Sequence, residues 1–174
     1  TLVNNPVEPY KKEPVIWHTL GELLKTGKQV DIQSPYTTAA PMTLQLFREI
    51  AENAEGLRLL TNSMASSPNY PAFSAYHYER KRFLKTGAEL YEYQNTASIH
   101  GKSCLMDGRI SVVGSFNLDD RSIYIDTETI LIIDSAEFNR QLSMQFDTLY
   151  ERCAKVGEDN DYVAEDAAKV LEVP

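Results

Sequence analysis

Cysteine and basic residues are scarce in this sequence, and each scarcity excludes a class of protein. Two cysteines in 174 residues are too few for a disulfide scaffold. Lys and Arg number 17 against 25 Asp and Glu, which gives a formal net charge of −8. A domain that holds nucleic acid tightly normally carries a basic stripe that neutralises phosphates. The charge therefore counts against nucleic acid as a partner.

Long apolar runs are also absent, and no stretch reaches the length of a membrane span. The first residues lack a signal-peptide pattern, and Thr1 is not a natural initiator, so we expect an excised piece of a longer chain. Hydrophobic residues at 43% and charged residues at 24% are ordinary values for one soluble globular domain. We expect Cys104, flanked by apolar residues, to be a buried packing residue.

Hydrophobic periodicity predicts an alternation of helices and strands. The expected helices cover residues 15–25, 43–54, 72–86 and 136–156. The expected strands cover residues 29–33, 57–60, 89–93, 99–105, 110–113 and 129–133. This order predicts an α/β fold in which helices sandwich a mixed β-sheet. Residues 1–14 are expected to be an extended segment, 15–156 the domain, and 157–174 an acidic C-terminal tail with room for one short helix.

His100 and Lys102 are the first candidate site residues. Residues two apart on a strand point to the same face, so a strand over 99–105 would place the imidazole beside the ammonium. Neither group is readily buried without a partner, and together they suit an anion. Asp107-Gly108, a dipeptide favoured in tight hairpins, then predicts that the chain turns back.

The returning strand is expected to bring Gly114, Ser115 and Asn117 alongside the first pair of residues. Gly114 permits close backbone approach, and Ser115 and Asn117 supply a hydroxyl and an amide that can donate hydrogen bonds. One cation, two neutral donors and a titratable imidazole could hold a tetrahedral phosphoryl group and stabilise charge on its oxygens.

The spacing His-x-Lys-x4-Asp, followed by Gly-Ser-x-Asn, resembles the HKD signature of the phospholipase D superfamily. The segments 117–122 and 126–128 are similar to the residues that follow this motif in bacterial cardiolipin synthases and their relatives. Residues 34–36 and 61–63 also resemble strand-end loops of that group, so the resemblance covers roughly residues 28–150. It implies a phospholipase D-like domain that carries a single motif.

The resemblance also implies a mechanism. Family members bring two motifs together; one histidine attacks phosphorus to form a phosphohistidine, and the other protonates the leaving alcohol and then activates the acceptor. Lys102 and Asn117 match phosphate-binding residues, and Ser115 matches a supporting hydroxyl. Glu128 matches a carboxylate that hydrogen-bonds the histidine and fixes its tautomer. Asp107 matches the motif in a structural turn position.

No metal and no cofactor is implied, because lysine does the cationic work and no second histidine stands at ligand spacing. His18 and His77 lack a lysine two residues on and are expected to be structural. A complete site therefore needs a missing N-terminal half or a second subunit. This half resembles the C-terminal one, in which His100 would be the acid-base residue rather than the nucleophile.

Tyr36 and Asn62 are further candidates, as substrate-binding residues, because both stand near strand ends where α/β sites lie. Arg121, close to several aspartates, is interpreted as part of an ion-pair network that shapes its loop.

Three functions stay open. The first is a phospholipase D or cardiolipin synthase type of activity on phospholipids, in a parent protein associated with the bacterial cell membrane. The second is a phosphodiesterase or nuclease completed by homodimerisation. The third is a catalytically inert fragment or scaffold half. The acidic charge and the similarity beyond the motif favour the first.

Overall fold

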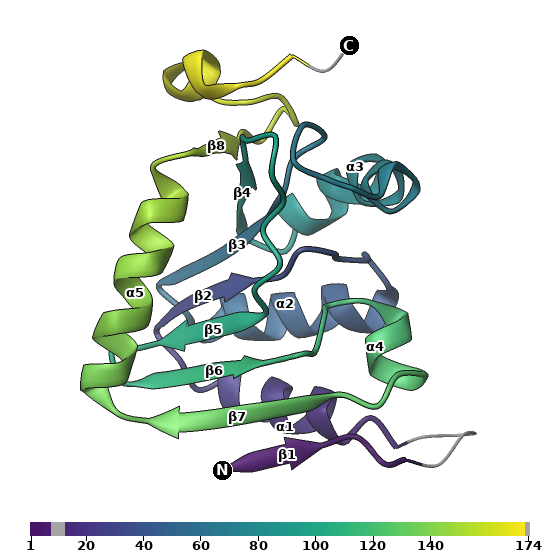
Figure 1. Cartoon of the computed structure of the whole chain (residues 1–174), viewed down its shortest axis with the longest axis vertical. Helices are drawn as coiled ribbons and strands as arrows, with labels where there is room; N and C mark the ends of the chain where they lie inside the picture. The colour runs from purple at the N-terminus through teal and green to yellow at the C-terminus, as the bar shows by residue number, and fades with distance from the viewer. Residues whose placement is uncertain (8–12, 173–174) are drawn as a thin grey trace.

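The computed structural model describes residues 1–7 and 13–172, whose strands form one eight-stranded mixed sheet in the order β1-β7-β6-β5-β2-β3-β4-β8 (Figure 1). The strands are β1 (Leu2–Asn4), β2 (Gln29–Gln33), β3 (Gly56–Asn62), β4 (Glu89–Tyr93), β5 (Ser103–Met106), β6 (Ile110–Gly114), β7 (Thr129–Asp134) and β8 (Cys153–Val156). The predicted α/β class with a mixed sheet is confirmed.

The centre of the sheet is parallel. Strands β2, β3 and β4 run in one direction because α2 (Pro41–Asn53) and α3 (Tyr70–Leu84) each return the chain to the start of the next strand. The carboxyl ends of these three strands therefore meet at one edge of the sheet. The loops that begin at Ser34, Ser63 and Gln94 all start from this edge.

Helices cover both faces of the sheet. Val30 and Ile32 of β2 belong to the core cluster that includes the apolar residues of α1 (Val15–Leu24) and α2. Asp31 points to the opposite face, where its carboxylate accepts a 3.1 Å hydrogen bond from Tyr150 at the end of α5 (Ala136–Tyr150). Figure 1 accordingly shows α5 along one side of the sheet and α2 behind its strands. Cys104 is 5% exposed, so its predicted burial is confirmed.

The helix predicted over 136–156 is wrong in its last turns, because α5 ends at Tyr150 and the chain continues as β8. Strand β8 pairs antiparallel with the outer edge of β4, with Leu90 opposite Val156. A strand there satisfies backbone groups that an open edge would leave unpaired, which a continued helix cannot do.

The two ends of the chain differ from expectation as well. The segment predicted as merely extended over 1–14 contributes β1, which pairs antiparallel with β7; its residues 8–12 lie outside the described part of the chain. The tail holds the predicted short helix, η1 (Ala164–Lys169), but it is not wholly solvated, because Tyr162 donates a hydrogen bond to the buried Glu92. The boundaries proposed for the domain stay a prediction.

The hairpin between β5 and β6 turns at Asp107 and Gly108, as predicted. Both residues have positive φ, 53° and 65°, the backbone conformation of the tight turns that suit twisted strands. Asp107 also reaches outside the hairpin, since its Oδ1 accepts hydrogen bonds from the backbone N–H groups of Lys28 (2.9 Å) and Gln29 (2.7 Å). The carboxylate therefore connects the turn to the start of β2.

We expect Asp107→Ala to destabilise the chain by about 2 kcal/mol, because alanine loses both acceptor contacts and is strained at positive φ. Asp107→Asn is the matched control, since asparagine tolerates this backbone and keeps an acceptor oxygen; its cost should stay under about 1 kcal/mol. Urea unfolding followed by circular dichroism measures both. Equal stability of the alanine variant and the unmodified chain would contradict this role.

Candidate functional site

His100 lies in the loop between β4 and β5, on the exposed surface. The strand predicted over 99–105 begins only at Ser103, so strand alternation is not what brings His100 and Lys102 together. Instead, the Lys102 ammonium turns back and donates a 2.8 Å hydrogen bond to the backbone carbonyl of His100. The imidazole packs edge-on against the ring of Tyr36, with 6.3 Å between ring centroids and 76° between planes.

Asn62 holds this loop in place. Its side chain is 2% exposed, its amide nitrogen donates to the carbonyls of Pro35 (3.2 Å) and Ile99 (3.1 Å), and its amide oxygen accepts from the Ile99 N–H (2.9 Å). These bonds take Ile99 out of the β ladder, which is why the strand starts later than predicted. Asn62 is buried and positions the residue before His100; its predicted contact with substrate stays a prediction.

Gly114 places the returning strand beside Lys102. Its N–H donates a 3.1 Å hydrogen bond to the Lys102 carbonyl, just beyond the Ser103–Val113 pair of the ladder. A Cβ added at Gly114 would stand 2.3 Å from the backbone oxygen of Thr129. Since backbone cannot give way as a side chain can, only glycine lets β6 approach β7 this closely.

Glu128 accepts hydrogen bonds from two serine hydroxyl groups of the site. Its side chain is 8% exposed and accepts hydrogen bonds from Ser115 and, at 3.1 Å, from Ser122. Ser115 in turn accepts a 3.1 Å hydrogen bond from the Thr129 N–H. Over residues 1–7 and 13–172, the hydrogen bonds of the Glu128 carboxylate come from these serines and not from His100. The predicted bond between Glu128 and a histidine is therefore not made within the described residues.

Asn117 belongs to the same network but is held loosely. Its amide nitrogen lies 3.4 Å from the Ser122 hydroxyl, a long contact for a hydrogen bond. Its buried amide oxygen has no hydrogen-bond partner within the described residues. A buried polar group left unpaired is costly, and the buried hydroxyl groups of Thr37, Thr38 and Thr43 are in the same position.

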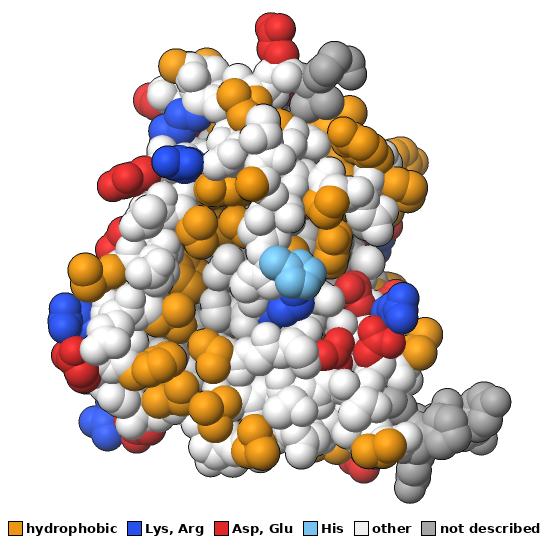
Figure 2. Space-filling model, viewed as in Figure 1, with side chains coloured by type: hydrophobic (Ala, Val, Ile, Leu, Met, Phe, Trp, Pro, Cys, Tyr) orange, Lys and Arg blue, Asp and Glu red, His pale blue; other side chains and the backbone are white. Residues whose placement is uncertain are grey.

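Opposing effects act on the charge of Lys102. Burial lowers the pKa of its ammonium from the ordinary value, and the negative charges of Glu128 and Asp119 work in the opposite direction. Arg121 is occupied elsewhere, because its Nε lies 3.0 Å from Asp126, in agreement with the predicted ion pair. Figure 2 shows a histidine and a basic side chain together near the middle of one face, beside a group of acidic side chains.

The sequence did not single out three further residues that take part in the site. Gln33 is 8% exposed, and its amide oxygen accepts a 3.0 Å hydrogen bond from the Ser103 hydroxyl. The Ser34 hydroxyl donates to the Tyr36 carbonyl (2.6 Å) and accepts from the Leu118 N–H (3.1 Å), so it ties two loops of the site together. Ser122 is the third. Their polar character at buried positions is visible only with the fold in hand.

The arrangement offers a cation, an imidazole and an amide on an open surface. Such a set can bind a phosphodiester and move a proton to or from its oxygen. Among the described residues, no group of three or more His, Cys, Asp or Glu side chains is placed to hold a metal ion.

Comparison with known proteins gives consistent matches. A family described as "Cardiolipin synthase, PLD-like domain" matches residues 20–150. The chain is 29% identical over 135 residues to an uncharacterized protein of Helicobacter pylori, covering 70% of this chain and 27% of that protein. It is 30% identical over 139 residues to cardiolipin synthase C of Escherichia coli, covering 69% of this chain and 29% of that protein. The chain thus spans less than a third of the length of these relatives.

Among solved structures, the phospholipase D family member Nuc from Salmonella typhimurium superposes with a TM-score of 0.70 at 12% sequence identity. The match covers 89% of this chain and 97% of Nuc. At this identity the likeness shows a shared fold and nothing more. In Nuc, this fold makes up nearly the whole of the solved chain.

We expect Glu128→Gln to lower the pKa of Lys102 further, because it removes the negative charge that most supports the ammonium. Carbon-detected NMR titration of the lysine side chain measures this pKa. Asp147→Asn, an exposed change on α5, is the control and should leave it unaltered. An unchanged or higher pKa of Lys102 in Glu128→Gln would show that Glu128 does not support this charge.

Proposed function

We propose the function of this chain from one premise: it belongs to the phospholipase D superfamily, as a cardiolipin synthase-like domain. The chain supplies one half of an active site that cleaves the phosphodiester of a phospholipid or transfers its phosphatidyl group. His100, Lys102 and Asn117 are the residues on which this half of the site depends, with Ser115 and Glu128 in supporting roles.

The observation that carries this proposal is the pair of hydrogen bonds that Lys102 makes, one with its own loop and one with the end of β6. The ammonium lies against the His100 carbonyl, and the N–H of Gly114 binds the carbonyl of Lys102 itself. The segment that leads to Asn117 is thereby fastened to the residue that would neutralise a phosphate. The unpaired oxygen of Asn117 and the partly buried charge of Lys102 both favour the arrival of a ligand.

The proposed chemistry divides acid-base work between two imidazoles. A histidine of the second half attacks phosphorus and forms a phosphohistidine, while His100 protonates the oxygen of the leaving alcohol. His100 then takes the proton from water or from an acceptor hydroxyl as the P–N bond breaks. Lys102 and the amide of Asn117 stabilise negative charge on the non-bridging oxygens throughout.

A second half completes the site. Glu128 has no histidine partner within the described residues, so we propose that it orients an imidazole of the other half, with Ser115 and Ser122 fixing its carboxylate. Leu131 of β7 is 40% exposed and Met144 of α5 is 55% exposed. Figure 2 shows hydrophobic side chains on the face that carries the histidine, a surface that a second half can cover.

Phospholipid is favoured over nucleic acid as the substrate. The net charge of −8 opposes a polyanion, and cardiolipin synthase C is among the relatives. The match to nearly all of Nuc supports the alternative in which a second copy, rather than an N-terminal half, completes a phosphodiesterase or nuclease. An inert scaffold half is the remaining alternative, and the intact motif disfavours it.

The parent protein is proposed to act at the bacterial cell membrane, where its phospholipid substrate lies. Within the described residues, no helix combines the length and the apolar character that a membrane crossing requires. Contact with the membrane would therefore have to come from surface side chains or from other parts of the parent protein.

In the full-length parent, we expect His100→Ala to lower turnover of phosphatidylglycerol at least about a thousand-fold, because the imidazole is the group proposed to deliver the proton. His18→Ala, at an exposed position of α1 outside the motif, is the control and should retain the rate. DNA is assayed in parallel. Turnover of DNA but not of lipid would replace the proposed substrate, and near-normal lipid turnover by His100→Ala would remove His100 from the mechanism.

The isolated 174-residue chain should show little turnover at concentrations where it is a monomer, because one motif lacks the nucleophile. If a second copy completes the site, specific activity should rise in proportion to the dimer fraction, as measured by analytical ultracentrifugation alongside the assay. Robust activity that is independent of chain concentration would mean that one motif suffices.

A further inference from the structure

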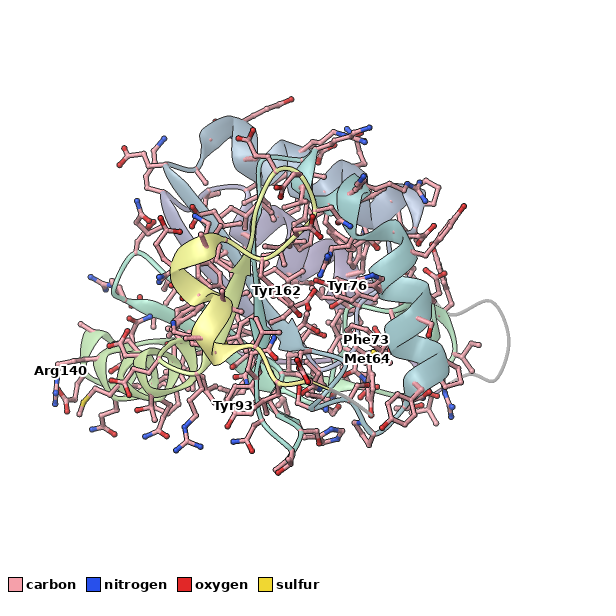
Figure 3. The ribbon with its side chains drawn as sticks, turned by 90° about the horizontal axis from the view of Figure 1, so that it is seen from above. Met64, Phe73, Tyr76, Tyr93, Arg140 and Tyr162 are labelled. Carbon is pink, nitrogen blue, oxygen red and sulfur yellow. The ribbon has the colours of Figure 1, made fainter. Side chains whose placement is uncertain are left out.

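A cavity of about 630 Å³ lies beyond the carboxyl ends of β3 and β4, at the same edge of the sheet as the loop of His100. Its walls come from three places: the loop after β3, one side of α3, and the C-terminal segment. Figure 3 shows Met64 and Phe73 between α3 and the C-terminal segment, with Tyr162 close by. This volume lies in the range of small-molecule sites.

The cavity offers mainly apolar surface and no unpaired arginine or lysine among its described lining residues. Met64 and Leu171, from opposite walls, are 48% and 41% exposed, and Phe73 lines the side formed by α3. Arg80 also borders the cavity, but its guanidinium is paired at 2.9 Å with the buried Glu92. Asp161 adds a negative charge to the lining. A phosphate chain would find no unpaired arginine or lysine among these lining residues, whereas a hydrocarbon would bury their exposed apolar atoms.

The C-terminal wall is built into the fold. Tyr162 donates its hydroxyl hydrogen to Glu92 and accepts a 3.1 Å hydrogen bond from the amide of Gln94. The oxygen of the same amide accepts a 3.2 Å hydrogen bond from the Leu171 N–H. Gln94, the first residue after β4, thus fastens the wall at two points. The cavity is therefore a formed site and not a gap beside a loose tail.

Two aromatic side chains lie between the cavity and the proposed reaction centre. Phe73 lines it and also lines a small void of about 10 Å³ that Tyr36 borders. Tyr36 packs against the imidazole of His100. A molecule whose phosphodiester lies at His100 would therefore have the cavity within reach of an attached chain that runs over the surface of Tyr36 and Phe73.

We propose that this cavity binds one acyl chain of the phospholipid whose phosphodiester reacts at His100, an inference that rests on the function proposed above. The apolar lining, the paired arginine and the path over Tyr36 and Phe73 together select a hydrocarbon chain attached to a phosphodiester. Tyr36, predicted to bind substrate, would then lie where headgroup and chain join.

The test is binding of lysophosphatidylglycerol with hexanoyl, octanoyl and decanoyl chains, each kept monomeric, to the 174-residue chain by isothermal titration calorimetry. Affinity should rise about four-fold for each added methylene group, the gain expected for burying hydrocarbon. Deacylated glycerophosphoglycerol measures headgroup binding alone. Equal affinity across the acyl series would overturn the proposal.

Ser74→Trp, on the side of α3 that lines the cavity, should fill it and flatten the chain-length series. Ala75→Trp, at the next and exposed position of α3 outside the lining, is the matched control and should keep the series. Circular dichroism and the unfolding midpoint establish that both variants fold. A steep series in folded Ser74→Trp would place the chain elsewhere and overturn the proposal.

The two proposals fail separately. A steep acyl series together with a parent protein that never turns over phosphatidylglycerol would support the cavity and refute the reaction. Lipid turnover that depends on His100, together with a flat acyl series, would refute the cavity and leave the reaction in place.

Discussion

The side-chain amide of Asn62 is the interaction on which the site depends most. It is buried at the end of β3 and binds backbone groups of two loops, one after β2 and one before β5. Tyr36 and His100 meet because these loops are held at fixed positions relative to each other. A buried amide that satisfies both of its ends in this way is costly to disturb, since any replacement leaves backbone groups unpaired.

Most hydrogen bonds of the polar groups in the site are made with other residues of the site. Ser115 and Ser122 converge on Glu128, and Lys102 rests on a carbonyl of its own loop. Among the polar groups of the motif, the amide oxygen of Asn117 has no hydrogen-bond partner within the described residues; the buried hydroxyl groups of Thr37, Thr38 and Thr43 have none either. Side chains held in this way are preorganised, which agrees with the proposal that a second half completes the site.

A second cluster of buried polar groups, centred on Glu92, lies at the same edge of the sheet on the side of the apolar cavity. Glu92 lies within the sheet with no exposed surface, and it is compensated by Arg80 and by hydroxyl groups of Tyr76 and Tyr162. A buried carboxylate requires such partners, and one of them comes from the C-terminal segment. The need to neutralise Glu92 thereby draws that segment onto the body and creates the wall of the apolar cavity.

The sequence by itself determined the α/β order, the turn at Asp107-Gly108 and the motif residues, because periodicity, turn chemistry and motif spacing are local properties of the chain. Tertiary structure decided the rest. It ended α5 at Tyr150, since the edge of β4 needed a pairing strand, and it buried Asn62 as a support for two loops. It also directed Glu128 to serines. Such outcomes depend on which distant groups compete for the same hydrogen bonds, and that competition exists only once the chain has folded.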